Sequence, residues 1–182
     1  MHWGNVLIKR TRTKQKRAKL NGVELNIQTS GLDVTIIDFT LSRLTTEDGD
    51  AFCDLNADPE LFAGPKGHCQ SETYRRMKRV TKGKWNKYCP KTNALWLHYL
   101  ADTLLTDKAA DMHLTGDQER ALRGFRKRAL GYDCAGDAVR DEILESAPDH
   151  VRDQVMQSVN LGDVAAQQKG RGAAPKMLKS EL

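Results

Sequence analysis

The run from Asn93 to Leu105 constrains the fold more than any other segment, because it carries apolar side chains on nearly every side of a helix. A helix that is apolar all round is stable only when other elements bury it. Its apolar members are Ala94, Leu95, Trp96, Leu97, Tyr99, Leu100, Leu104 and Leu105. We therefore predict that this helix is buried.

Other helices are predicted on both sides of it. Ser71 is suited to cap a helix whose apolar face carries Tyr74, Met77 and Val80. Shorter helices are predicted over 135–145 and 148–159, and residues 162–182 offer little apolar surface to bury, which is typical of a disordered tail.

Thr115 and Gln118 have the spacing of a capping box, which predicts a helix from there to about Leu130. The apolar stripe of this helix is predicted to consist of Leu114, Ala121, Leu122, Phe125 and Ala129.

Residues 1–38 have the pattern of a small β unit. Short β-branched or alternating runs at 6–8, 23–27 and 34–37 predict strands, and Asn21-Gly22 predicts a turn before the second. The basic residues that follow the first run are predicted to form a loop. Together with the helices this gives an α+β fold that is mostly helical.

Residues 41–70 hold Gly, Pro, Asp and Asn at short intervals and predict a long irregular segment, a kind that is usually functional or disordered. Four apolar residues are predicted to anchor it to the body: Phe52, Leu55, Leu61 and Phe62.

The net charge of +5 is concentrated between Lys9 and Lys19, where seven of eleven residues are Lys or Arg. Such a run indicates a nuclear address, a phosphate-binding patch with weak nucleic-acid contact, or simply a solvated basic loop. No module that reads bases accompanies it.

The four cysteines are far apart and form no Cys-x-x-Cys pair, which disfavours a structural zinc site. Residues 1–30 lack the apolar stretch of a secretory signal, and no apolar run is long enough for a membrane span. We therefore expect free thiols, a reducing intracellular setting and no membrane partner.

Two polar residues stand where a loop meets a strand. Asn5 immediately precedes the strand that starts at Val6, and Asp38 ends the apolar run Val34–Ile37. Protein kinases hold magnesium with one asparagine and one aspartate in this chain order, because this hard cation takes oxygen ligands and keeps several from phosphate and water. An aspartate at the end of a strand is also common for purely structural reasons, so this pair alone leaves both interpretations open.

The exact residues of the two motifs point to one family more specifically than the Asn5–Asp38 pair does. His2-Trp3-Gly4-Asn5 and Asp38-Phe39-Thr40 resemble the haspin family of atypical serine/threonine protein kinases, whose members carry His-Trp-Gly-Asn and an Asp-Tyr-Thr type motif. The resemblance covers residues 2 to about 105. It continues through Leu41-Ser42-Arg43-Leu44, Phe52-Cys53-Asp54, Leu61-Phe62, Tyr74-Arg75-x-Met77-Lys78, Trp85 with Tyr88 and Pro90, and Asn93-x-Leu95-Trp96-Leu97-His98-Tyr99-Leu100.

The resemblance implies a kinase C-terminal lobe over 1–160 and no N-lobe within the chain. The disordered tail that the composition predicts then occupies 161–182. It further implies ATP and Mg²⁺ as cofactors, with Asn5 and Asp38 as metal ligands and Phe39 and Thr40 anchoring the activation segment. It also implies a nuclear, chromatin-associated enzyme that phosphorylates a threonine of a core histone tail.

In the family, carboxylates at the positions of Asp58 and Glu60 bind the positive groups of the basic peptide. Position 59 is proline here, where the family can carry another acid. The interpretation of Asp58 and Glu60 as part of a solvated loop stays open.

The kinase catalytic loop, His-Arg-Asp-Leu-x-x-x-Asn, places its catalytic aspartate five residues before the asparagine. Counted back from Asn5, that aspartate falls just before Met1, and the nucleotide-binding residues of the N-lobe also lie outside the chain. We therefore expect the chain alone to be inactive, to bind ATP and Mg²⁺ without stability, and to expose apolar surface at the rim of its β unit. The alternatives are a non-catalytic remnant that binds basic tails or chromatin, and a nucleic-acid binder acting through residues 9–19.

Overall fold

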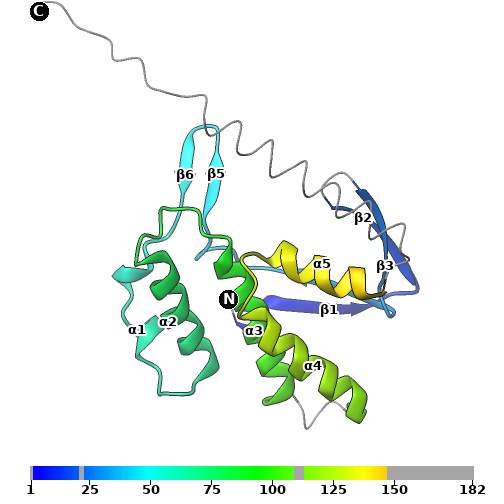
Figure 1. The fold of residues 1–182 in the computed structure, drawn as a ribbon. Coiled ribbons are helices and arrows are strands. Elements are labelled where there is room, and N and C mark those ends of the chain that lie inside the picture. The colour runs from blue at the N-terminus through cyan, green and yellow to red at the C-terminus, as the bar shows by residue number, and fades with distance from the viewer. Residues whose placement is uncertain (1, 21–22, 109–112, 147–182) are drawn as a thin grey trace, which may run out of the picture. The chain divides into compact units, whose positions relative to one another are not determined.

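The structure is a computed structural model that describes residues 2–20, 23–108 and 113–146 (Figure 1). The chain divides into two compact units, one of Met1–Arg10 and Leu32–Asp141 and the other of Thr11–Gly31 and Glu142–Leu182. Helices and short strands are mixed, which confirms the α+β class. Within the described ranges no helix has the length and apolar character to cross a membrane.

The core of the first unit forms around α3 (Lys91–Leu105), which packs against α2 (Cys69–Thr81) and α4 (Gly116–Ala129) (Figure 1). Trp96 of α3 makes edge-to-face contacts with Tyr74, at 5.1 Å between ring centroids, and with Tyr99, at 5.4 Å. Such pairs each add about 0.5–1.5 kcal/mol beyond the burial of area. The prediction that this helix is buried is thus confirmed.

Two helix starts differ from prediction. α2 begins at Cys69 with His68 as its N-cap, so Ser71 lies inside the helix and the predicted Ser71 cap is wrong. The physical reason is that the buried Ser71 hydroxyl pairs with Nδ1 of His68 at 3.0 Å instead of with a backbone N–H. α3 begins two residues before Asn93, directly after Pro90, whose φ of −64° already suits a helix.

The predicted capping box of α4 is confirmed. The Thr115 N–H donates to Oε1 of Gln118 at 2.9 Å, and the Gln118 N–H donates to Oγ1 of Thr115 at 3.3 Å. Ala129 is fully buried at the C-terminal end of the helix, but Ala121 is exposed and does not belong to the buried stripe. Helix α5 (Ala135–Ser146) matches the prediction for 135–145. The helix predicted over 148–159 and the predicted tail over 161–182 lie outside the described residues.

Two antiparallel strand pairs account for the N-terminal β unit. In the first unit β1 (Val6–Arg10) pairs with β4 (Leu32–Ile36), so that Val6 lies opposite Ile36. Leu7, Ile8 and Val34 of this pair are 51%, 51% and 55% exposed, which confirms the expected apolar surface on the strands.

The second unit contains the hairpin of β2 (Gln15–Leu20) and β3 (Val23–Gln28). The prediction of a strand over 23–27 is confirmed, but the prediction of a basic loop is wrong for residues 15–20, which form β2. In β2, Ala18 and Leu20 alternate with charged residues and pair in register with Leu25 and Val23. The density of charge concealed this two-residue period, which is the signal of a strand.

The segment predicted to be irregular holds short elements. β5 (Leu44–Thr46) pairs with β6 (Gly49–Ala51), and η2 (Leu55–Ala57) and α1 (Glu60–Ala63) follow. Of the four predicted anchors, Leu55 is 2% exposed in the core, and Leu61 and Phe62 pack against that core. Phe52 is 45% exposed, so it is not an anchor of the same kind.

Candidate functional site

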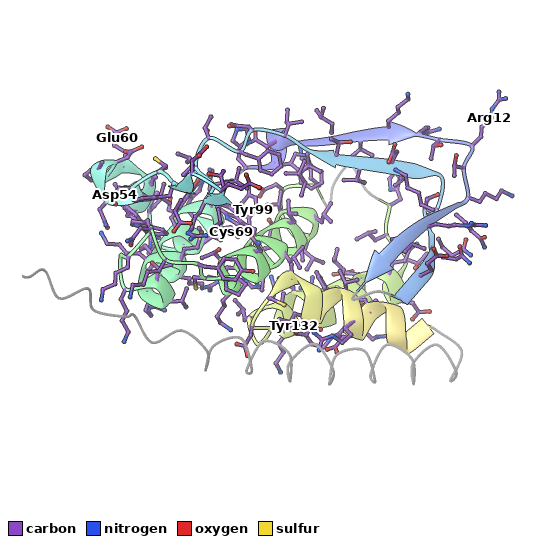
Figure 2. The ribbon with its side chains drawn as sticks, turned by 90° about the horizontal axis from the view of Figure 1, so that it is seen from above. Arg12, Asp54, Glu60, Cys69, Tyr99 and Tyr132 are labelled. Carbon is purple, nitrogen blue, oxygen red and sulfur yellow. The ribbon has the colours of Figure 1, made fainter. Side chains whose placement is uncertain are left out.

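Asn5 is held by a single 3₁₀ turn, η1 (Trp3–Asn5). The His2 side chain caps this turn, accepting from the Gly4 N–H at 3.0 Å, and the Asn5 N–H donates to the His2 carbonyl at 3.0 Å. The Trp3 N–H donates to the hydroxyl of Tyr99, which comes from α3 and is labelled in Figure 2, at 3.1 Å. The turn is thereby tied to the central helix, and Asn5 is buried.

Asp38 follows β4 and lies at the same end of the β1–β4 pair as Asn5, because Val6 at the start of β1 pairs with Ile36 at the end of β4. Pairing of β1 with β4 continues as a hydrogen bond from the Ile37 N–H to the Asn5 carbonyl, at 2.9 Å, which aligns the two loops. Nδ2 of Asn5 donates to Oδ2 of Asp38 at 3.2 Å, although 33 positions separate them in sequence. The strand register therefore brings together the two residues that the sequence predicts as a pair.

The backbone at Asp38 lies in the left-handed region, with φ of 61°. Asp and Asn are among the few residues other than glycine that adopt this region readily. Backbone of this kind persists only where surrounding contacts over-determine it, and it is concentrated at functional sites. Here Thr40 supplies two of those contacts, since its Oγ1–H donates to Oδ1 of Asp38 at 2.7 Å and its N–H donates to the same oxygen at 3.3 Å.

These hydrogen bonds favour the charged carboxylate. The Thr40 hydroxyl, then the Thr40 N–H, and also the Asn5 amide lower the pKa of Asp38 below its ordinary value, against a smaller opposing effect of desolvation. Asp38 is therefore an ionised oxygen donor at neutral pH, which is the state that a cation requires.

Asn5 and Asp38 line a cavity of about 700 Å³ in the first unit. Thr40 also lines this cavity, as do the core residues Tyr74, Trp85 and Trp96. Pockets of roughly 300–1,000 Å³ with apolar walls and a few convergent polar groups are typical of sites for small molecules and cofactors. The cavity therefore places one carboxylate and one amide beside a space that accommodates a small molecule.

The two oxygen-bearing side chains of Asn5 and Asp38 suit a hard cation that takes its remaining ligands from phosphate and water. No group of three or more His, Cys, Asp or Glu residues suited to hold a metal occurs among residues 2–20, 23–108 and 113–146. A zinc centre built from these residue types is thus not found in that part of the chain, and the four cysteines are free thiols. One carboxylate and one side-chain carbonyl agree with magnesium, which keeps several water or phosphate ligands.

The other predicted site residues lie in different places. Thr40 contacts Asp38 as described, while the Phe39 side chain is 64% exposed and its carbonyl accepts from the Ser42 N–H at 2.9 Å. Asp58 and Glu60 do not line the cavity; both are exposed, at the end of η2 and the start of α1 (Glu60 is labelled in Figure 2). Oδ1 of Asp58 accepts from the Glu60 N–H at 3.1 Å, which holds the Asp58 carboxylate at the start of α1.

Two arginines that the motif analysis did not single out hold the segment between Asp38 and α2. Arg43 donates from Nε to the Asn86 carbonyl at 2.9 Å and pairs with Asp50 at 2.6 Å, which fixes the β5–β6 hairpin. Arg75 of α2 donates to the Phe62 and Gly64 carbonyls at 2.6 and 2.9 Å, which fixes the end of α1. The sequence signal was their position within the stretches that resemble the haspin family, but only the structure gives their partners.

Comparison with known proteins identifies the family of the chain. The family model described as "Haspin like kinase domain" matches residues 1–129. A serine/threonine-protein kinase haspin homolog of Arabidopsis thaliana is 44% identical over 155 residues, which are 85% of this chain and 25% of that protein. The serine/threonine-protein kinase haspin of Mus musculus is 50% identical over 127 residues, which are 70% of this chain and 16% of that protein.

A homolog from Schizosaccharomyces pombe is 34% identical over 169 residues, which are 84% of this chain and 34% of that protein. The chain thus spans about a third or less of the length of these three relatives. The motifs around Asn5 and Asp38 and the match over residues 1–129 lead to one conclusion: this chain belongs to the haspin family of serine/threonine protein kinases.

Proposed function

We propose that this chain supplies the C-terminal lobe of a haspin-type kinase and, within it, the half of the active site that holds magnesium. The contact between Asn5 and Asp38, at 3.2 Å and at one end of the antiparallel β1–β4 pair, carries the proposal. It supplies the two oxygen-bearing side chains that kinases use for Mg²⁺, in the chain order that kinases use.

In this proposal Asp38 binds the cation with its carboxylate and Asn5 with its side-chain carbonyl. The bound cation would neutralise charge on the phosphates of ATP. Thr40 keeps Asp38 ionised and oriented, and Tyr99 holds the turn that carries Asn5. Because the cavity beside them has a volume of about 700 Å³, it offers room for phosphate groups and water.

Metal binding by the chain itself tests this assignment without relying on turnover. In the isotope-labelled 182-residue chain with ATP, Mn²⁺ should broaden the NMR signals of Asn5 and of residues 38–40 first, and excess Mg²⁺ should reverse the effect. Asp38→Asn should abolish this broadening, while Asp48→Asn, an exposed carboxylate in the β5–β6 turn, should leave it unchanged. Broadening centred elsewhere, or unaffected by Asp38→Asn, would overturn the assignment.

The proposed substrate is a basic peptide, and specifically a threonine in a core histone tail. Support comes from Asp58 and Glu60, two exposed acidic residues on one turn, where the Asp58 carboxylate accepts from the Glu60 N–H. The rigid attachment of α1 through Arg75 keeps them in place for a ligand with several positive groups. Such a substrate implies a nuclear location, which imaging of a fluorescent fusion would test.

Peptide affinity tests this second part by itself. A labelled histone-tail peptide should lose affinity for the chain when Asp58→Asn and Glu60→Gln are combined. The matched control combines Glu47→Gln and Asp48→Asn, which removes the same charge from another exposed turn. Equal losses from both variants would show that the peptide responds only to net charge.

Phosphate transfer requires a catalytic base in addition to the metal-binding residues Asn5 and Asp38. A polypeptide of residues 1–182 has no aspartate ahead of Asn5 to act as the catalytic base. General-base catalysis contributes about 10²- to 10⁴-fold to rate. We therefore expect this polypeptide, tested by itself, to transfer no measurable phosphate to a histone-tail peptide, and robust Asp38-dependent transfer would refute that expectation.

A further inference from the structure

The strand β2 and the turn before it carry a concentration of positive charge that the kinase chemistry does not use. Residues 12–17, here called the basic segment, contain four cations and no acid: Arg12, Lys14, Lys16 and Arg17. All four are exposed. Figure 2 shows the labelled side chain of Arg12 projecting outward from the turn that precedes β2.

The backbone of the basic segment is ordered by hydrogen bonds rather than left as a free loop. The Thr11 N–H donates to the Gly31 carbonyl at 2.9 Å, and the Thr29 N–H donates to the Lys14 carbonyl at 3.0 Å. The Thr29 hydroxyl also donates to the Thr13 carbonyl at 2.5 Å. Each of the cations therefore starts from a fixed backbone position, so less conformational entropy is lost on binding than in a flexible tail.

The partner strand adds little negative charge. In register, Lys16 lies opposite Ile27 and Arg17 lies opposite Asn26. The single acid of β3, Glu24, pairs in register with Lys19, outside the basic segment. The hairpin therefore keeps a net positive charge even when its own carboxylate is included.

The composition of the hairpin also decides what kind of anion it suits. Residues 9–31 contain no Phe, Tyr, Trp or His. Recognition of single-stranded nucleic acid depends strongly on such residues, because bases stack on their rings. A surface with exposed Lys and Arg but no rings can contact phosphates, which carry no sequence information directly.

We propose that the β2–β3 hairpin is a docking surface for duplex DNA, contacting phosphates through the basic segment without reading sequence. This activity is separate from phosphate transfer and would hold the chain near chromatin. Binding should be independent of sequence, and duplex DNA should bind at least as tightly as a single strand of equal charge.

Salt dependence gives the expected magnitude. If the four cations each neutralise one phosphate, the slope of log affinity against log salt is about −3.6 for duplex DNA, which lowers affinity about 150-fold between roughly 50 and 200 mM salt. The assay is fluorescence anisotropy of a labelled duplex with the full 182-residue chain.

Variants that remove or retain the charge of the basic segment then distinguish this proposal from its alternatives. The variant with Arg12→Gln, Lys14→Gln, Lys16→Gln and Arg17→Gln should lose most of this slope. A matched control removes four exposed cations elsewhere, through Lys66→Gln, Arg79→Gln, Lys84→Gln and Lys127→Gln, and should keep the slope. Arg12→Lys with Arg17→Lys keeps the charge and should keep the affinity.

Three outcomes would overturn the proposal. Equal losses in the hairpin variant and its matched control would assign binding to net charge alone. A single strand that binds much more tightly than the duplex would require stacking, for which these residues offer no rings. Tighter binding to vesicles of anionic lipid than to duplex DNA, at equal salt, would identify a membrane surface instead.

Discussion

Replacing Tyr99 by Phe tests whether the central helix holds the turn that carries Asn5. The change removes only the hydroxyl oxygen that accepts from the Trp3 N–H at 3.1 Å, and it keeps the ring that packs on Trp96. A neutral hydrogen bond contributes about 0.5–1.5 kcal/mol net, which corresponds to a change of about 2- to 13-fold in a local opening equilibrium.

Amide hydrogen exchange reads this opening residue by residue. Protection at Trp3 and Asn5 should fall about 2- to 13-fold more than protection at Leu95, which reports the stability of the core helix. Tyr88→Phe is the matched control, because Tyr88 is 75% exposed and its ring keeps its contact with Arg43. Equal loss of protection at Trp3 and Leu95 would mean that Tyr99 stabilises the fold as a whole and does not hold the turn.

Three further changes probe the core, the carboxylate and a buried thiol. Leu55→Ala should lower the free energy of unfolding by about 2–5 kcal/mol in urea denaturation, since Leu55 is 2% exposed and the change leaves a cavity; an unchanged midpoint would refute its place in the core. Thr40→Val should raise the pKa of Asp38 toward its ordinary value in an NMR titration, because the Thr40 hydroxyl bond is the largest influence that lowers it. The lowered pKa of Asp38 stabilises the folded chain at pH values above the ordinary carboxyl pKa, and this stabilisation is lost as pH falls through the folded pKa. The stabilisation should be smaller in Thr40→Val, which lacks the hydroxyl, whereas Thr40→Ser should retain it. Burial, followed by a hydrogen bond to Asp102, raises the pKa of Cys69 to about 12. Alkylation of Cys69 should therefore be slow in mildly alkaline buffer, and Asp102→Asn should accelerate it, as mass spectrometry of the folded chain would show.

The sequence was sufficient wherever a local pattern determines structure. The apolar residues on nearly every side of the helix over 93–105 predicted its burial, and the spacing of Thr115 and Gln118 predicted a capping box that forms with both hydrogen bonds. The capping box joins neighbours in the chain, and the apolar character of the helix is visible within a single segment. Asn5 and Asp38 were predicted as a pair from the residues of their two motifs, and the strand register explains why they meet.

The sequence was insufficient where a residue had a choice of partners or where its partner lies far away in the chain. Ser71 has the residue type of an N-cap, but the nearby ring of His68 takes its hydroxyl and the helix starts earlier. Charge concealed the alternation of β2, because Ala18 and Leu20 find their register partners only when β3 is present. The support of Trp3 by Tyr99 spans 96 positions, and no local pattern encodes a contact of that kind.

Phosphate transfer by a chimera tests the central claim most directly. Residues 1–129 of this chain would replace the matched part of the mouse relative, so that the rest of that kinase supplies what precedes Asn5. With radiolabelled ATP and Mg²⁺ the chimera should phosphorylate a histone-tail peptide. Asp38→Asn should lower the rate on the order of a hundredfold or more, because a metal contributes several kcal/mol of charge stabilisation in the transition state. Asp48→Asn, at an exposed turn, should leave the rate unchanged. A folded chimera whose rate is the same with Asp38 and with Asn at that position would contradict the assignment of Asp38 as a metal ligand.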